Sequence, residues 1–234
     1  MKLVDIFAIA KFAKSHQIIT AADNTFASPI IQNPINLGID VVIHSATKYF
    51  GGHSDISAGA VASSQVIMDQ IWDLAKYFGG NLSDYTVWLL ERSMKTLGIR
   101  VKAQQRNAKR LAKYLNKHAA VKSVYYPGLK SNEYHSLAKI QMKGFGAMLS
   151  FELKDRFDSE KFLKALKLIK PSMSLAGVES TMLLPSKTSH SLLSELDRKN
   201  QGITDQLIRF SVGIETVKDL IKDIEQAISA SHLN

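Results

Sequence analysis

The stretch IDVVIHSATKYFGGHSD, residues 39–55, changes from an apolar run to a polar loop that contains glycine. The run predicts a buried strand over Val41–His44. Two hydroxyls and a lysine follow it directly, namely Ser45, Thr47 and Lys48. Further buried strands are predicted over 17–26, with Asp23 at its end, and over 56–63. Apolar strands separated by helices or long loops indicate an α/β protein with a mainly parallel sheet.

The rest of the chain predicts a second, smaller α/β unit. Helical spacing of apolar residues predicts helices over 3–13, 83–98, 99–118, 159–170 (before Pro171) and 217–233. Strands are predicted over 122–128, 146–154 and 206–215. We expect residues 1–100 to belong to a large sheet domain, and residues 101–234 to form a smaller C-terminal α/β domain.

Composition narrows the classes of partner. The 234 residues carry a net charge of +9 and include no cysteine, which removes disulfides and thiolate metal sites and fits a cytoplasmic location. The basic cluster over 100–117 has helical spacing and predicts the solvated face of a helix. No nucleic-acid-binding motif accompanies it, and no apolar run reaches membrane-spanning length. We expect no nucleic-acid partner, no membrane partner and no metal.

Asp23 and Lys48 are predicted at the ends of neighbouring strands, where open α/β sheets bind ligands. From spacing alone, a structural ion pair explains the two charges equally well. The pair also suits pyridoxal phosphate, which needs a lysine for a Schiff base and a carboxylate against its ring nitrogen. Ser45 and Thr47 offer hydroxyl donors for the phosphate.

Several motifs together resemble the cysteine/methionine metabolism family of pyridoxal-phosphate enzymes, the trans-sulfuration enzymes. In chain order they are DNTFASP (23–29), HSATKYFGGHSD (44–55), SLAGVES (174–180), TSH (188–190) and GITDQLIRFSVGIE (202–215). The resemblance runs through nearly the whole chain and implies the fold-type I architecture of these enzymes. It also implies an amino-acid substrate and a homo-oligomer, a homotetramer, in the full-length form.

The resemblance assigns roles at the cofactor by position. Lys48 matches the lysine that binds the cofactor covalently and then shuttles protons. Asp23 matches the aspartate that keeps the ring nitrogen protonated. Ser45 and Thr47 match the hydroxyls that bind the phosphate.

Three further residues match the binding site for the substrate α-carboxylate. Arg209 matches an arginine that binds this group, a task that suits a guanidinium. Without the resemblance, an ordinary exposed arginine is the more frequent explanation for Arg209, and a binding role stays open. Ser174 and Leu175 match the loop that lines the same site. Ala176 replaces a glycine that the family usually has, and we expect it to perturb this loop mildly.

The resemblance favours the bacterial cystathionine β-lyase branch, which cleaves cystathionine by β-elimination. Met173 stands where several γ-specific members carry a glutamate, and this difference supports β-elimination. Cystathionine γ-synthase, cystathionine γ-lyase and homoserine sulfhydrylase remain alternatives.

The family has a long region before the stretch that matches KLVDIFAIAK (2–11), so we expect an N-terminally truncated chain. It is then a fragment, the partner of a separately encoded N-terminal part, or an inactive remnant with a structural or interaction role. We also expect exposed strand edges, exposed apolar surface and poor solubility.

Overall fold

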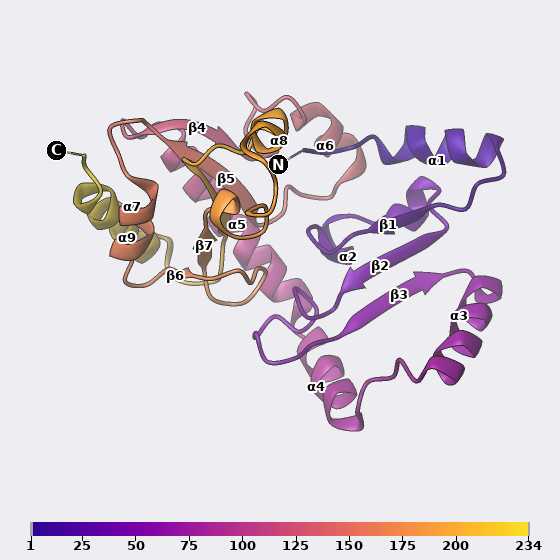
Figure 1. The fold of residues 1–234 in the computed structure, drawn as a ribbon. Helices are drawn as coiled ribbons and strands as arrows, with labels where there is room; N and C mark the ends of the chain where they lie inside the picture. The colour runs from indigo at the N-terminus through magenta and orange to yellow at the C-terminus, as the bar shows by residue number, and fades with distance from the viewer. Residues whose placement is uncertain (1, 234) are drawn as a thin grey trace.

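The computed structural model describes residues 2–233, which form two β-sheets with helices around them (Figure 1). The first part contains α1 (Ile6–Ser15), β1 (Ala21–Asp23), α2 (Ser28–Ile31), a 3₁₀ helix (Pro34–Leu37), β2 (Val41–Ser45), β3 (Gly59–Ser63), α3 (Gln65–Phe78) and α4 (Asp84–Met94). The second part contains α5 (Leu97–Leu115), β4 (Val121–Tyr125), α6 (His135–Gln141), β5 (Met148–Leu153), α7 (Ser159–Ala165), β6 (Lys170–Pro171), β7 (Thr181–Leu183), a 3₁₀ helix (Pro185–Lys187), α8 (Glu195–Asn200), β8 (Leu207–Ser211) and α9 (Val217–Ala230).

The first sheet has three strands in the order β1-β2-β3. Strands β1 and β2 are parallel, with Asp23 opposite Ile43, whereas β3 runs antiparallel to β2. Helix α1 packs beside this sheet through a small buried cluster that includes Ile6, Ala10 and Val42. Because β1 and β2 are parallel, their carboxyl ends meet at one edge, and the loops that carry the candidate residues leave from that edge.

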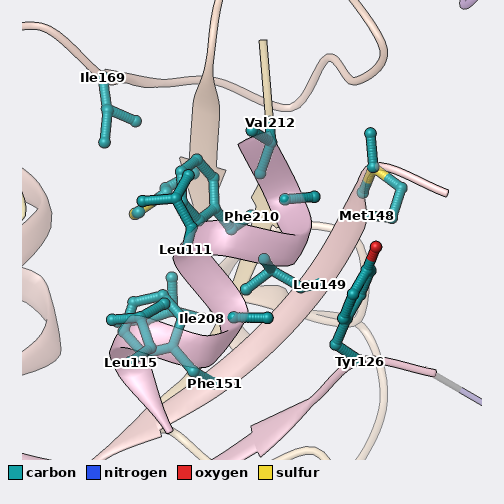
Figure 2. Packing of buried hydrophobic residues seen from close by; sticks show 14 of the residues in the cluster. Leu111, Leu115, Tyr126, Met148, Leu149, Phe151, Ile169, Ile208, Phe210 and Val212 are labelled. Carbon is teal, nitrogen blue, oxygen red and sulfur yellow. The ribbon is translucent and has the colours of Figure 1, made fainter. Parts of the chain in front are cut away.

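The second sheet has five strands in the order β4-β5-β8-β7-β6. All six residues of β5 are buried, as expected for a central strand covered on both faces. Leu111 and Leu115 of α5 pack against apolar side chains of the sheet, among them Phe151 and Phe210 (Figure 2). Helix α5 is therefore anchored in the main core of the protein.

The α/β class predicted from the sequence is confirmed, and the strands predicted within 17–26, over Val41–His44 and within 56–63 form as β1, β2 and β3. The prediction that these strands are buried was wrong for β1 and β3, neither of which contains a buried residue. Both sheets are mixed, because β3 and most strands of the second sheet have antiparallel neighbours. The proposed division after residue 100 stays a prediction, and α5 runs across that position. Within residues 2–233, no helix is both long enough and apolar enough to cross a bilayer.

Two further local predictions were wrong. The helix expected over 159–170 ends at Ala165, and Lys170–Pro171 forms a short strand instead. The basic cluster on α5 is not uniformly solvated, because the side chain of Arg100 is only 5% exposed. Both differences come from contacts with segments far away in the sequence.

Candidate active site

The ends of β1 and β2 hold Asp23 and Ser45 in a fixed relation. The Asp23 carboxylate accepts a hydrogen bond from the Thr25 amide at 2.9 Å, and the Thr25 hydroxyl accepts one from the Ser45 amide at 2.7 Å. Thr25 thus ties the loop after β1 to the end of β2. The Ser45 hydroxyl makes no hydrogen bond to any other group among residues 2–233, so it can still donate to a ligand.

Lys48 lies in a tight turn that follows β2. The Lys48 amide donates to the Ser45 carbonyl at 3.0 Å, and the Lys48 carbonyl accepts from the Gly52 amide at 2.7 Å. Thr47 secures the start of this turn, because its hydroxyl accepts from the Ala58 amide at 2.9 Å and contacts the Ala58 carbonyl at 3.3 Å. We call residues 45–52 the lysine turn.

Lys48 and Asp23 do not form the simple ion pair that the sequence left open. The five ion pairs found among residues 2–233 involve neither residue. The two charges therefore stand at adjacent strand ends without neutralising each other in a direct contact. A cavity of about 350 Å³ borders Asp23, but its lining includes neither Lys48 nor Ser45.

His44 is buried just before Ser45 and packs edge to face against Phe50, with ring centroids 4.8 Å apart. Burial lowers the pKa of His44, and the negative charge of Asp23 opposes this shift. A buried, neutral imidazole packed on an aromatic ring is consistent with a structural role for His44.

Arg209 lies on β8 and reaches the loop that contains Ser174. Its Nη2 donates to the carbonyls of Met173 at 2.9 Å and Ser174 at 3.2 Å. Burial lowers the pKa of this guanidinium. The structure thus brings together Arg209, Ser174 and the neighbouring buried Leu175, which the sequence had grouped as a carboxylate site.

The loop over 174–178 also meets the lysine turn. The Val178 amide donates to the Gly52 carbonyl at 2.9 Å. Ala176 in this loop has a φ of +65° and is completely buried. A left-handed conformation costs an L-residue roughly 1–2 kcal/mol, so surrounding contacts must hold the loop in this shape. The lysine turn and the loop of the candidate carboxylate site are therefore in direct contact.

Sequence reasoning missed three polar residues of α5 beside these segments: Arg100, Gln104 and Asn107. All three are buried and donate hydrogen bonds to main-chain carbonyls of loops. Their spacing of i, i+4 and i+7 was a signal that they share a face of the helix. Nothing in the local pattern indicated that this face is buried.

The residues present fit pyridoxal phosphate. Within the described part of the chain, the Lys48 amine and the Ser45 hydroxyl have no partner in the turn, and the adjacent strand end offers the Asp23 carboxylate. These are the amine, phosphate donor and ring-nitrogen partner that the cofactor requires. Among residues 2–233, no group of three or more histidine, aspartate or glutamate side chains is arranged to hold a metal.

Comparison with known proteins gives a consistent result. The family model described as Cys/Met metabolism PLP-dependent enzyme matches residues 1–229. The chain is 44% identical over 229 residues to cystathionine β-lyase of Lactococcus lactis subsp. cremoris (strain MG1363), covering 97% of this chain and 60% of that protein. It is 42% identical over 229 residues to cystathionine γ-lyase of Bacillus subtilis (strain 168), with the same coverage of 97% and 60%.

A solved structure has the same fold. Cystathionine γ-lyase from Lactobacillus plantarum, complexed with L-serine, superposes with a TM-score of 0.95 at 42% identity, covering 98% of this chain and 61% of that one. The fold-type I architecture expected from the sequence is thereby confirmed. The chain spans about 60% of the length of the curated relatives it matches.

Proposed function

Because the chain belongs to the Cys/Met metabolism family of pyridoxal-phosphate-dependent enzymes, we propose that it carries the cofactor lysine and the substrate-carboxylate site of a carbon–sulfur lyase. The observation that carries this proposal is the Lys48 amine, which makes no ion pair among residues 2–233 and lies in the turn that follows β2, the strand that pairs in parallel with β1 and its terminal Asp23. The substrate is cystathionine, which β-elimination followed by hydrolysis with one water molecule converts to homocysteine, pyruvate and ammonia. The protein acts as a homo-oligomer.

Each residue has a task in this reaction. Asp23 holds a proton at the ring nitrogen of the cofactor, and Ser45 donates to its phosphate. Thr47 also donates to the phosphate when its hydroxyl turns away from the long 3.3 Å contact with Ala58. Bound pyridoxal phosphate supplies an electron-withdrawing ring that stabilises negative charge at the substrate Cα.

Lys48 and Arg209 act on the substrate itself. Arg209 binds the α-carboxylate as a charge-assisted pair and so orients the substrate. The Lys48 amine accepts the proton from Cα, and the electron pair left at Cα forms a double bond to Cβ. The bond between Cβ and sulfur breaks with its electron pair on sulfur, which takes up a proton and leaves as the thiol of homocysteine. The lysine turn adjoins the loop that Arg209 contacts, so we expect one substrate to reach both residues.

Met173 supports β-elimination over γ-chemistry. Its carbonyl accepts from Arg209, and its apolar side chain is 64% exposed. An apolar side chain here offers no charged partner to a distal amino group of the substrate. Relatives with either specificity are almost equally similar to this chain, so the choice between β- and γ-cleavage is a proposal from this residue.

Reductive trapping tests the role of Lys48. Purified chain is mixed with pyridoxal phosphate and reduced with borohydride, and the modified peptide is identified by mass. We expect the adduct on the peptide that contains Lys48, its loss in Lys48→Arg, and its retention in Lys102→Arg, which changes an exposed lysine. An adduct spread over surface lysines and insensitive to Lys48→Arg would contradict the proposal.

Product analysis tests the specificity. The chain is fused to the N-terminal region of a relative and given cystathionine. Pyruvate as the keto-acid product supports β-cleavage. Formation of 2-oxobutyrate would contradict β-cleavage and indicate γ-cleavage instead. A Lys48→Arg version of the fusion provides the background rate.

A further inference from the structure

Three buried polar side chains line one face of α5. Arg100 is 5% exposed, Gln104 is 0% exposed and Asn107 is 6% exposed. Their positions i, i+4 and i+7 place them one above the other along the helix. We call these three residues the α5 polar stripe.

Arg100 holds the carboxyl end of the lysine turn. Its Nη1 donates to the Tyr49 carbonyl at 2.8 Å, and its Nη2 donates to the Phe50 carbonyl at 3.1 Å and the Ser93 carbonyl at 2.9 Å. Burial lowers the pKa of this guanidinium. The side chain makes no ion pair among residues 2–233. Its charge is thus compensated by the carbonyls that directly follow Lys48.

Gln104, one turn further along α5, holds the loop over 174–178. Its Nε2 donates to the Gly177 carbonyl at 2.7 Å and the Ala176 carbonyl at 3.3 Å. The Ala176 amide is held as well, because it donates to the Ser211 hydroxyl at 2.7 Å. These bonds oppose the cost of the left-handed conformation of Ala176.

Asn107 holds the turn that follows β8, the strand of Arg209. Its Nδ2 donates to the Gly213 carbonyl at 3.1 Å and the Glu215 carbonyl at 2.8 Å. Helix α5 therefore bonds to the lysine turn, to the loop over 174–178 and to the turn that follows the strand of Arg209.

We infer that Arg100, Gln104 and Asn107 are positioning residues that set the spacing between Lys48 and the carboxylate site. The inference rests on the proposed function. The lysine turn and the carboxylate site come from segments more than 100 residues apart, and one rigid helix bonded to both fixes their relative position. Loss of one donor leaves buried carbonyls unpaired and frees one segment selectively.

Hydrogen exchange of the chain without cofactor gives the first test. We expect Arg100→Lys to accelerate exchange of the Gly51 and Gly52 amides by about tenfold or more. Gln104→Met should do the same for the Ala176 and Val178 amides, and leave Gly51 and Gly52 nearly unchanged. Arg110→Lys, which changes an exposed arginine of the same helix, should leave both segments unchanged. An equal increase in the exchange rates of all segments, including β5, would mean that the α5 polar stripe only stabilises the core as a whole, and would overturn the inference.

Reductive trapping gives the second test. The adduct yield at Lys48 should fall by about tenfold in Arg100→Met and recover partly in Arg100→Lys, because lysine restores one donor. Gln104→Met should still form the adduct at Lys48. The variant with pyridoxal phosphate bound should bind L-serine more weakly than the parent chain, because Gln104 holds the loop over 174–178. Unchanged yields in both Arg100 variants would contradict the inference.

The two proposals fail in distinguishable ways. If the unmodified chain forms no adduct at Lys48, the proposed function fails, while the exchange pattern still decides the positioning role. If the adduct forms normally and the variants change neither exchange nor yield, only the positioning role fails. Where an Arg100 variant does not fold, judged by near-ultraviolet circular dichroism, Gln104→Met carries the test.

Discussion

Gly52 and Arg100 lie so close together that the backbone of one limits the side chain of the other. Gly52 has a φ of +73°, and a Cβ added there would overlap Nη1 and Cζ of Arg100. Glycine is needed at this position for its conformation and also for the space it leaves to a buried cation. The two glycines after Lys48 were visible in the sequence, but the guanidinium beside them was not.

Comparison of Gly52 with Gly79 separates the effect of the left-handed conformation from the effect of the space that Arg100 needs. Gly79 also has a positive φ, +68°, but a Cβ there would meet nothing within 4 Å. Gly52→Ala and Gly79→Ala should both lose roughly 1–2 kcal/mol to left-handed strain. Gly52→Ala should lose about 2 kcal/mol more, because Arg100 is displaced from its buried carbonyls. Urea unfolding measures both, and equal losses would mean that Arg100 moves aside without cost.

At the scale of elements, α7 ends early because α9 offers partners for the chain that follows it. The Asp223 carboxylate of α9 accepts from the amides of Lys167, Leu168 and Ile169 at 2.8, 2.9 and 2.8 Å. A buried acid on the apolar face of an amphipathic helix thus replaces the helical hydrogen bonds that these amides would otherwise make. The apolar spacing over 159–170 could not reveal this competitor.

Asp223→Ala should destabilise the protein by about 3 kcal/mol or more, because three buried amides lose a charged acceptor. Asp223→Asn keeps one acceptor oxygen and should lose less. Asp219→Ala changes an exposed acid of the same helix and should stay within about 0.5 kcal/mol of the parent. A loss for Asp223→Ala no larger than that for Asp219→Ala, measured by thermal or urea unfolding, would show that water replaces the carboxylate.

The whole molecule is unevenly packed. Every residue of β5 is buried, whereas α3 has no buried residue. In Figure 1, α3 lies at the outer end of the first sheet, away from the five-stranded sheet. Several of its apolar side chains are exposed, with Trp72 at 61% and Phe78 at 83%. Exposed apolar surface of this kind agrees with the expectation from the sequence, and poor solubility remains a prediction.

Hydrogen exchange should divide the molecule accordingly. Amides of α3 should exchange by local opening and much faster than amides of β5, since the helix has little tertiary contact. Amides of β5 should exchange only through global unfolding. The Gly79→Ala variant, at the end of α3, should leave protection of β5 unchanged apart from its effect on global stability. Comparable protection of α3 and β5 would mean that the apolar face of α3 is covered in solution, for example by a second copy of the chain.

The sequence by itself determined the family, the α/β class, the strand that ends at Asp23, the strand that precedes Lys48, and the grouping of Arg209 with Ser174. These depend on local patterns and on motifs a few residues long. The tertiary structure alone decided that Lys48 and Asp23 form no ion pair, that Arg100 is buried, and that Asp223 ends α7. Each of these depends on which distant segment supplies a hydrogen-bond partner. A buried polar residue and a solvated one have the same local spacing, so only the folded chain distinguishes them.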